Sequence, residues 1–532
     1  MNFVKSLSGK QRRSLAVMAV ILVLAFILML RDAASFGVDD SYIFFRYAEN
    51  VAQGEGFVFN AGEPAGEGFT SWVWTLMLTL FHYTGLDMVL VSKVLGVLFH
   101  VLGGVFVFLL ARQISGKDAI GAIIAAILTT AFLLNYRLVA HSVSGMETSL
   151  YICSLVLLAY LTTLALQAPA AQAKWWLTIS LTTLGLFLVR PEGIAAGGMS
   201  LLALAIHQRK NLFKPKTWFY VIIGLVAPLA LFIIMKLLVF GYPLPHSFYH
   251  KLIVMDREYA ESFRQFWLFL QAYWWLVLLA IATALFTIIK RKQYLFVYYG
   301  VLFIAMTGLY LFFYPAMNYL DRFYIPYLPL LLLMIEPVLR ILAEKLNRLR
   351  PAWVFPLGLI MAAAILVVGI NPGLHSVQKK VKSWALMVNP DMYRAKLGKI
   401  MSTLPAEIVV ANSEMGVIPY YSRLTCIDMA GLTDPYIAHH GLSLTYLEER
   451  KVDLILFSRD VAKISTPQWN KYTLNYKAVF LSRRFKEDFQ CIGAFNAWPG
   501  SDKKYYLYAD KMSPHFADIR QWQQKYAAEL EL

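Results

Sequence analysis

This sequence contains few charged residues. Asp, Glu, Lys and Arg make up only 15% of its 532 residues, whereas 58% are hydrophobic and the mean hydropathy is +0.55. Soluble domains of this length are not built from such a composition, which excludes a soluble protein. The composition instead predicts a polytopic membrane protein.

Several motifs with known chemistry are also absent. The chain has no Walker loop, no G-x-G-x-x-G turn after a strand, no HExxH helix and no paired Cys/His spacing. The adjacent His439 and His440 lie in an expected loop, where solvation is commoner than metal binding. Nucleotide binding of these types and a structural zinc site are therefore not expected.

Cysteine is rare, with three in the chain. Cys153 lies within a hydrophobic run and is expected to be a core residue. Cys426 and Cys491 both fall in the polar C-terminal part and could form a disulfide if that part is extracytoplasmic.

The net charge of +16 does not indicate nucleic acid. Residues 1–371 hold 28 Lys and Arg, and most of them flank hydrophobic runs. Such a distribution is a signal for orientation in a membrane, so the lipid bilayer is an expected partner and nucleic acid is not.

The hydrophobic runs predict eleven transmembrane helices and an uncleaved signal anchor at the start of the chain. The segment Phe69–Tyr83 is apolar but short, and we expect it to lie in the membrane interface. The loops on the amino-terminal side then hold 18 basic residues against eight on the other side, which predicts a cytoplasmic N-terminus. The predicted spans are 15–30, 88–111, 119–135, 148–167, 175–190, 194–208, 218–240, 267–289, 294–314, 324–342 and 352–371.

The composition changes after residue 371. Residues 372–532 carry 21 basic and 16 acidic residues, with short apolar runs between turns. We expect a transmembrane domain over 1–371 and a soluble extracytoplasmic α/β domain over 372–532. Its expected helices include 390–401 and 516–529, and its expected strands are 408–411, 425–427, 452–457, 478–481 and 505–508.

Two adjacent acids, Asp39 and Asp40, follow the first hydrophobic run. The next residues have the period of an amphipathic helix at a membrane surface, with Phe44 and Tyr47 on one face and Arg46 on the other. One interpretation is that Asp40 caps this helix and Asp39 is solvated. The other is that one of the acids is a general base, and the two roles are compatible.

The predicted topology places several further polar residues on the outer face. Each also has a structural explanation: Glu147 as a helix cap, Arg190 with Glu192 as an ion pair, His246 as an interfacial histidine, and Arg322 as a partner of Asp321. Lys236, within a span, is expected to snorkel or to form a buried pair. Taken together, cations suit a lipid-linked phosphate, and carboxylates suit activation of an attacking hydroxyl.

The sequence resembles the GT-C superfamily of polyprenyl-phosphate-sugar-dependent glycosyltransferases, and within it the bacterial terminal arabinofuranosyltransferases. The resemblance covers most of the chain in matching order, although Phe69 and Ser71 stand where relatives often have tyrosine and asparagine. The motifs that carry it are Asp39–Tyr42 with Arg46–Ala48, Gly56–Glu63, Glu67–Ser71, Ser144–Thr148, Arg190–Gly193, Gly241–Tyr249, Gly416–Ser422 and Ile427–Asp434.

The resemblance implies transfer of a sugar, arabinofuranose or a related one, from an undecaprenyl- or decaprenyl-phosphate donor. The acceptor is expected to be a cell-envelope glycan or a surface protein at the outer face of a bacterial inner membrane. No cofactor is required by the sequence, and a divalent metal near the acid pair is compatible with it.

The expected site residues fall into three groups. Asp39 or Asp40 is the catalytic base, and we favour Asp40 because it would stand at the positive end of the surface helix, although that dipole would also lower its basicity. The expected donor and phosphate ligands are Arg190, Lys251, Arg322, His246 and Tyr249. The expected sugar or acceptor ligands are Tyr42, Arg46, Glu67, Glu147 and Glu192.

A transporter or flippase of lipid-linked sugars is the competing class, and a non-catalytic envelope scaffold is a third. Transporters often have repeated halves and functional polar groups near the midplane of the membrane. Here the polar residues gather on one face and no repeat is visible, which favours an enzyme.

Overall fold

The computed structural model describes residues 9–169, 172–253, 259–291, 295–312, 317–348, 354–458, 460–461, 474–496 and 504–530. The chain folds as two compact units that alternate along the sequence. The first comprises Met1–Ala34, Lys93–Leu231 and Glu258–Gln378, and the second comprises Ser35–Ser92, Phe232–Arg257 and Lys379–Leu532.

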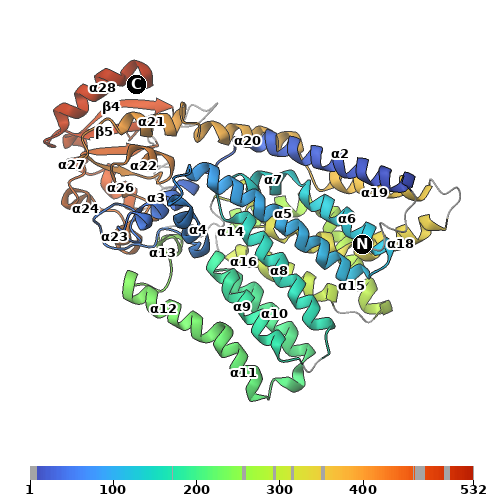
Figure 1. Ribbon diagram of the computed structural model, residues 1–532. Coiled ribbons are helices and arrows are strands. Elements are labelled where there is room, and N and C mark those ends of the chain that lie inside the picture. The colour runs from blue at the N-terminus through green and yellow to red at the C-terminus, as the bar shows by residue number, and fades with distance from the viewer. Residues whose placement is uncertain are drawn as a thin grey trace. The chain divides into compact units, whose positions relative to one another are not determined.

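The first unit is helical (Figure 1). Its helices form because a helix in a long apolar run satisfies its backbone hydrogen bonds within the segment, as a membrane requires. Within it, α8, α9 and α10 pack against one another. The helices mostly in this unit are α2 (Gly9–Ala33), α5 (Met88–Ser115), α6 (Ala119–Leu133), α7 (Tyr136–Ser142), α8 (Thr148–Gln167), α9 (Lys174–Val189), α10 (Gly193–His207), α11 (Pro215–Val221), α14 (Tyr259–Ala272), α15 (Trp274–Phe286), α16 (Leu295–Phe312), α17 (Leu328–Met334), α18 (Glu336–Asn347) and α19 (Val354–Gly369).

Helices lie at all eleven predicted spans. Among the described residues, five helices or continuous helical runs are long and apolar enough to cross a membrane, or up to eight if each of three bent pairs forms one span. Two further predicted spans form the shorter helices α9 and α10. The multi-pass architecture is confirmed, and the count of eleven stays a prediction.

The short apolar segment Phe69–Tyr83 forms α4 (Trp72–His82). Ser71 caps it by accepting a hydrogen bond from the backbone N–H of Trp74. Eleven residues of helix extend about 16 Å, about half of the ~30 Å hydrocarbon core. Its length therefore agrees with the expected interfacial position.

The second unit contains a five-stranded mixed sheet of order β2-β1-β3-β5-β4. β1 pairs in parallel with β2 and β3, while β5 pairs antiparallel with β3 and β4. Its strands are β1 (Val409–Asn412), β2 (Thr425–Asp428), β3 (Leu454–Phe457), β4 (Phe489–Asn496) and β5 (Lys504–Asp510); its helices are α3 (Ser41–Ala52), α4, most of α12 (Ala227–Phe240), α13 (His246–Ile253), most of α20 (Leu374–Met387), α21 (Tyr393–Met401), α22 (Val417–Ser422), α23 (Pro435–His440), α24 (Leu444–Glu449), α26 (Leu474–Phe480), α27 (Arg483–Asp488) and α28 (Phe516–Leu530).

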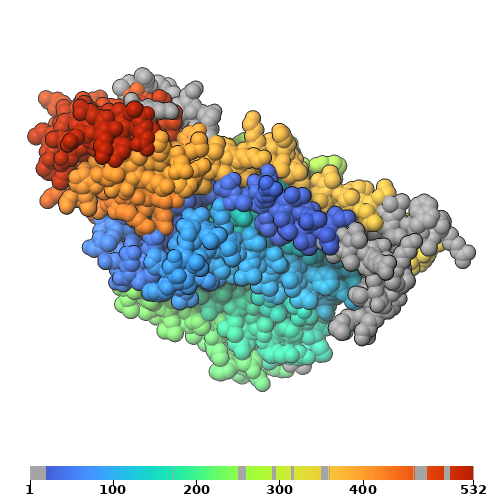
Figure 2. Space-filling view, turned by 45° about the horizontal axis from the view of Figure 1, so that its top comes forward, coloured from blue at the N-terminus to red at the C-terminus, as the bar shows by residue number. Residues whose placement is uncertain are grey.

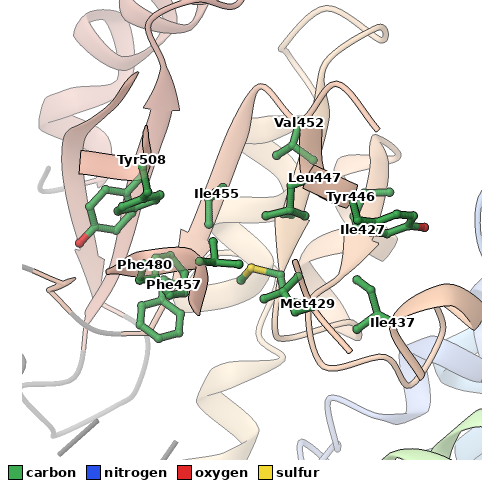
Figure 3. Close-up of a cluster of buried hydrophobic side chains, with 14 residues drawn as sticks. Ile427, Met429, Ile437, Tyr446, Leu447, Val452, Ile455, Phe457, Phe480 and Tyr508 are labelled. Carbon is green, nitrogen blue, oxygen red and sulfur yellow. The ribbon is translucent and has the colours of Figure 1, made fainter. Parts of the chain in front are cut away.

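One face of this sheet packs on a core of aliphatic and aromatic side chains (Figure 3). Ile455 of β3 lies at its centre, with Ile427 of β2 on one side and Tyr508 of β5 on the other. The orange-to-red residues of the sheet and its helices form one closely packed surface in Figure 2. The predicted extracytoplasmic segment therefore does have the expected α/β fold.

Four of the five predicted strands are present, as β1, β2, β3 and β5. The fifth, 478–481, is wrong, because these residues form the end of helix α26 and the start of the turn after it. Phe480 there packs on Phe457 and Phe485. A four-residue apolar run has no period that separates a strand from a buried helix end. The prediction also missed β4, whose alternation is interrupted by a bulge between Cys491 and Gly493.

The disulfide that Cys426 and Cys491 could have formed is absent from the structure. Cys426 is buried in β2 and Cys491 is exposed in β4, at the two opposite edges of the sheet, and both are free thiols. Three strands lie between them. Such a separation far exceeds the ~5.5–6 Å between Cα atoms that a disulfide needs.

The compact units do not divide at residue 371. The first outer loop and the segment after the seventh predicted span pack with the C-terminal sheet. Arg46 provides one physical reason, because its guanidinium donates to the carbonyl oxygens of Pro419 (2.6 Å) and Leu424 (2.9 Å). Asn60 provides another, exchanging hydrogen bonds of 2.9 and 3.0 Å with the backbone of Cys426 in β2.

Candidate active site

Asp39 is buried in the second unit, against the residues that follow strand β1. Its carboxylate accepts hydrogen bonds from the backbone N–H groups of Gly416 and Val417, both at 3.2 Å. Arg394 Nη1 lies 3.1 Å from its Oδ1. Gly416 must lack a side chain, because a Cβ there would collide with the Asp39 backbone oxygen. Asp39 is thus fixed by three donors, not solvated.

Asp40 occupies the residue before α3 and is half-buried. It has helical backbone angles and its side chain does not cap the helix, so the capping interpretation is wrong. Its backbone oxygen instead accepts from the N–H of Ile43 at 3.2 Å. Of the two acids, Asp40 is therefore the less buried residue, and its side chain does not cap α3.

Both acids lie where the sheet changes winding direction. The chain passes from β1 to β2 on one side and from β2 to β3 on the other, so the carboxyl end of β1 is a topological switch point. Beyond that end, the Gly416 N–H donates to Asp39, and Glu414 shares the Arg394 guanidinium with it. Switch points of parallel sheets are where open α/β folds bind ligands.

Tyr42 and Arg46 are not available as sugar or acceptor ligands. Tyr42 is 2% exposed and its ring packs edge-on against Phe45 and Tyr420. Arg46 is 6% exposed and donates to Phe59 and Asn60 in addition to the two carbonyls described above. Arg46, on the polar face of α3, is bonded to the C-terminal sheet, and these two assignments are corrected.

Glu67 forms a buried ion pair in the second unit. Lys236 Nζ lies 2.7 Å from its Oε2, and the Trp72 indole N–H donates to its Oε1 at 2.7 Å. The expectation that Lys236 forms a buried pair is confirmed. Burial raises the pKa of Glu67, while Lys236 acts in the opposite direction. This pair neutralises the charge of Lys236, and the expected role of Glu67 as a sugar or acceptor ligand stays a prediction.

His246 and Tyr249, both on α13, meet a helix of the C-terminal sheet. His439 of α23 stacks on Tyr242 with ring centroids 3.6 Å apart, and lies 4.5 Å from Tyr249 and 5.5 Å from His246. Burial lowers the pKa of His246 to about 4, so its imidazole is neutral at pH 7. The sequence analysis expected His439 in a solvated loop. It lies on α23 and stacks on Tyr242, a contact that the residues around His439 do not predict.

The remaining residue expected on this segment is Lys251. It falls within α13, but its side chain is outside the part of the chain that the structure describes. Its expected role as a phosphate ligand stays a prediction.

In the first unit, Glu147 lies between two arginines. Its side chain is fully buried, with Oε1 3.5 Å from Arg190 Nη1 and 3.2 Å from Arg322 Nη2. Glu147 stands at the start of α8 without capping it. Gly145, with φ +84°, makes the turn that precedes it. The structure thus brings together three of the predicted site residues.

Glu192 joins the same cluster. Arg190 Nε lies 2.6 Å from its Oε1, and the Tyr310 hydroxyl donates to it at 2.7 Å. Phe323 contacts both guanidinium groups through its ring, at 5.5 Å for Arg190 and 5.7 Å for Arg322. Two arginines and two glutamates therefore lie together beside the aromatic rings of Phe323 and Tyr310.

Arg322 and its neighbour Asp321 each contact a residue elsewhere in the first unit. Asp321 Oδ2 lies 2.9 Å from Nε of Arg137, and Arg322 turns to Glu147. Adjacent residues on this tight 3-10 turn point in different directions, because Leu320 and Asp321 both have positive φ. Arg322 is thus directed into the Glu147 cluster.

The cluster retains unused hydrogen-bonding capacity. Glu147 Oε2 and Arg190 Nη1 are buried and have no hydrogen-bond partner within the described part of the chain. Leaving such groups without a partner costs about 1–3 kcal/mol each, more when they are charged. A polar ligand or water is the usual partner for groups of this kind.

No metal site accompanies these clusters in the part of the chain that the structure describes. No group of three or more His, Cys, Asp or Glu side chains there is placed to hold an ion.

Asp428 is a second buried acid of the sheet. It ends β2 and accepts hydrogen bonds from the N–H groups of Thr433 (2.7 Å) and Ala430 (2.8 Å). Burial raises its pKa to about 7. It shapes the loop that leads to Asp434, which caps α23 through the N–H of Ile437. Asp428 therefore positions the helix that carries His439.

Raising the pH from 5 to 8 is expected to lower the melting temperature of the full-length protein in detergent. Asp428 has a pKa of about 7 in the folded protein, so between pH 5 and 7 it keeps a proton that the unfolded chain has lost. The free energy of unfolding therefore falls as the pH rises, by at most about 1.4 kcal/mol per pH unit. Asp428→Asn should flatten the slope, and Asp391→Asn, at an exposed acid, should not. Equal slopes in wild type and Asp428→Asn would contradict this assignment.

The whole chain has the fold of two kinds of solved protein. It resembles ArnT from Cupriavidus metallidurans bound to undecaprenyl phosphate, with a TM-score of 0.57 and 12% identity over 93% of this chain and 97% of ArnT. It also resembles the Archaeoglobus fulgidus oligosaccharyltransferase in complex with Zn and sulfate, with a TM-score of 0.51 and 11% identity over 91% and 72% of the two chains. The expected GT-C-like fold class is confirmed.

A third similar structure is AglB from Archaeoglobus fulgidus in complex with an inhibitory peptide and a dolichol-phosphate. Its TM-score is 0.50 at 10% identity, over 82% of this chain and 69% of that one. Residues 386–508 match the family described as Domain of unknown function (DUF8728). No curated protein sequence matches the chain.

Proposed function

We propose that this protein is an integral-membrane glycosyltransferase that uses a polyprenyl-phosphate sugar as donor. The observation that carries the proposal is the acid pair, in which Asp39 is fixed by three donors and Asp40 is half-buried beside it at the carboxyl end of β1. The fold supports it, because similar structures hold undecaprenyl phosphate and dolichol-phosphate.

In the proposed reaction, Asp40 is the general base. The acceptor hydroxyl gives its proton to the Asp40 carboxylate while its oxygen bonds to the anomeric carbon of the donor. The bond from that carbon to the phosphate oxygen breaks, and the polyprenyl phosphate leaves with the electron pair. Asp39 is the less suitable base, because two amide N–H groups and Arg394 hold its charge in place.

Arg190 and Arg322 are the proposed phosphate ligands. A guanidinium matches the geometry of a phosphate, and Arg190 Nη1 is buried without a hydrogen-bond partner in the described residues. Glu147 and Glu192 hold the guanidinium groups in place. In addition, Glu147 Oε2 can accept a hydrogen bond from a sugar hydroxyl. The cluster is neutral overall without a ligand, which limits the cost of its burial.

The acceptor is proposed to be an envelope glycan or surface protein at the outer face of the membrane, with the N-terminus in the cytoplasm. The excess of basic residues in the amino-terminal-side loops supports that orientation. Arabinofuranose is the sugar implied by the sequence resemblance. His246 and Tyr249 remain proposed donor ligands, and the neutral imidazole suits a hydrogen bond to a sugar hydroxyl.

Transfer by the purified full-length protein tests the proposal directly. Synthetic polyprenyl-phosphate sugars are incubated with envelope acceptors, and mass spectrometry follows the release of free polyprenyl phosphate and the mass added to the acceptor. Loss of the same glycan from a deletion strain is expected. Movement of intact lipid-linked sugar between leaflets without cleavage of the sugar–phosphate bond would instead identify a flippase.

A further inference from the structure

The second unit brings two histidines together where α13 packs on α23 (Figure 1). The rings of His246 and His439 are almost perpendicular, at 86°, with centroids 5.5 Å apart. His246 is 1% exposed, and both of its ring nitrogens are buried without a hydrogen-bond partner within the described part of the chain. The same holds for Nε2 of His439. Three imidazole nitrogens in one place therefore have unused hydrogen-bonding capacity, and a polar ligand or water is the usual partner for such groups.

Both imidazoles are held in place by contacts that leave these three nitrogens available. The backbone N–H of His246 donates to the carbonyl oxygen of Glu67 at 3.1 Å, which fixes the start of α13. The ring of His439 stacks on Tyr242 at an interplanar angle of 13°. Asp434 caps the start of α23, the helix that carries His439. The two rings are thus placed before any ligand arrives.

Gly66 leaves space beside one of the buried nitrogens. A Cβ on this residue would lie 3.5 Å from Nε2 of His246 and 3.1 Å from Cγ of Pro435. Gly66 does not have a positive φ, so its backbone conformation alone does not require glycine. What the missing side chain provides is room next to the His246 ring, and this observation is independent of the unpartnered nitrogens.

The chemistry of the two rings fits hydroxyl groups. Burial lowers the pKa of His246 to about 4 and also lowers the pKa of His439, so both imidazoles are neutral at pH 7. A neutral imidazole has one nitrogen that donates and one that accepts, and a hydroxyl also does both. A phosphate, in contrast, accepts hydrogen bonds and is bound best by cations. The described residues also offer no group of three His, Cys, Asp or Glu side chains for a metal ion here.

We propose that His246 and His439 together bind the sugar of the donor, so that helix α23 of the C-terminal sheet takes part in selecting that sugar. This inference rests on the proposed glycosyltransferase activity and on the donor role of His246. Nε2 of His439 bonds one sugar hydroxyl, the His246 ring bonds another, and Gly66 leaves room for the sugar beside His246. A site that bonds a hydroxyl in this way rejects the analogue that lacks it.

The test compares the full-length wild type with His439→Phe, which keeps a ring to stack on Tyr242 and removes the nitrogens. Polyprenyl-phosphate pentoses and hexoses are assayed as donors, and the best donor is then compared with analogues that each lack one sugar hydroxyl. The KM for the best donor is expected to rise about 3- to 10-fold in His439→Phe, the usual effect of one hydrogen bond between neutral groups. One deoxy donor should lose the same factor with the wild type and lose nothing further with His439→Phe.

Three further variants separate a direct contact from a structural effect. His439→Gln places an amide near the position of Nε2 and should recover part of the donor affinity. Gly66→Ala fills the space beside His246 without removing a polar group, and it should also raise the KM for the donor. His440→Phe is the matched control, because His440 is the next residue of α23 and is exposed, and its KM should equal that of the wild type.

Melting temperatures identify any variant that does not fold, and His439→Leu replaces His439→Phe in that case. An unchanged KM for the donor in His439→Phe and Gly66→Ala, with normal transfer by the wild type, would overturn this sugar site and leave the proposed function standing. A rise in the KM for the acceptor alone would overturn it as well. If the wild type transferred sugar from none of the donors, the proposed function would fail together with this inference.

Discussion

Asp40→Asn is expected to lower the turnover of sugar transfer by about 10²- to 10⁴-fold, the usual contribution of a positioned general base. The substitution keeps the shape of the side chain and removes its ability to accept a proton. Because Asp40 is half-buried and does not cap α3, the fold should tolerate it. The measurement is single-turnover transfer from a polyprenyl-phosphate sugar, with enzyme in excess over the donor.

Asp39→Asn is the matched variant and should behave differently. Its amide would place an N–H group against one of the backbone donors of Gly416 and Val417 and would leave Arg394 with fewer anions. We expect a lower melting temperature together with lower activity. If both asparagine variants turn over like wild type, the acid pair does not supply the base.

Arg190→Ala is expected to cause the largest loss of stability among substitutions in the first unit. It would leave Glu192 without its closest cation and Glu147 with Arg322 alone. Removing one partner of a buried ion pair costs about 3–5 kcal/mol, because the other charge stays buried without compensation. The melting temperature of the detergent-solubilised protein should fall by many degrees.

The control is Arg264→Ala, which breaks an ion pair between neighbouring turns of α14. Arg264 is 62% exposed, and exposed pairs contribute about 1 kcal/mol or less. Arg190→Lys separates stability from donor binding: it keeps a charge near Glu192 but loses the planar fork that fits a phosphate. Its KM for the donor should rise, whereas its melting temperature should fall much less than that of Arg190→Ala. An unchanged KM would exclude Arg190 as a phosphate ligand.

The sequence predicted the fold class well because its signals are local. Long apolar runs give helices, and the runs around Val410, Ile427, Ile455 and Leu507 give strands. Where four residues were all that marked an element, as at 478–481, the period could not decide between strand and helix. These failures are of element type and leave the architecture unchanged.

The pairing of the polar residues follows a different rule. Glu147, Arg190 and Glu192 were singled out because charges near the ends of membrane helices need partners, and they are one another's partners. Arg46 was misassigned because its bonds reach residues more than 370 positions away. Glu414 and His439 were missed for the same reason: only the folded sheet brings them to Asp39 and Tyr242.

The bonds of Arg46 and Asn60 to the C-terminal sheet determine which parts can be exchanged between such proteins. Removing residues 380–532 would take away the carbonyl oxygens of Pro419, Leu424 and Cys426 to which these two side chains donate. A truncated protein would therefore report misfolding and not the choice of sugar acceptor. A chimera must therefore carry over 35–92, 232–257 and 379–532 together. For the same reason, substitutions on α3 and those around β1 and β2 are expected to compensate one another, so the two regions should diverge as a pair.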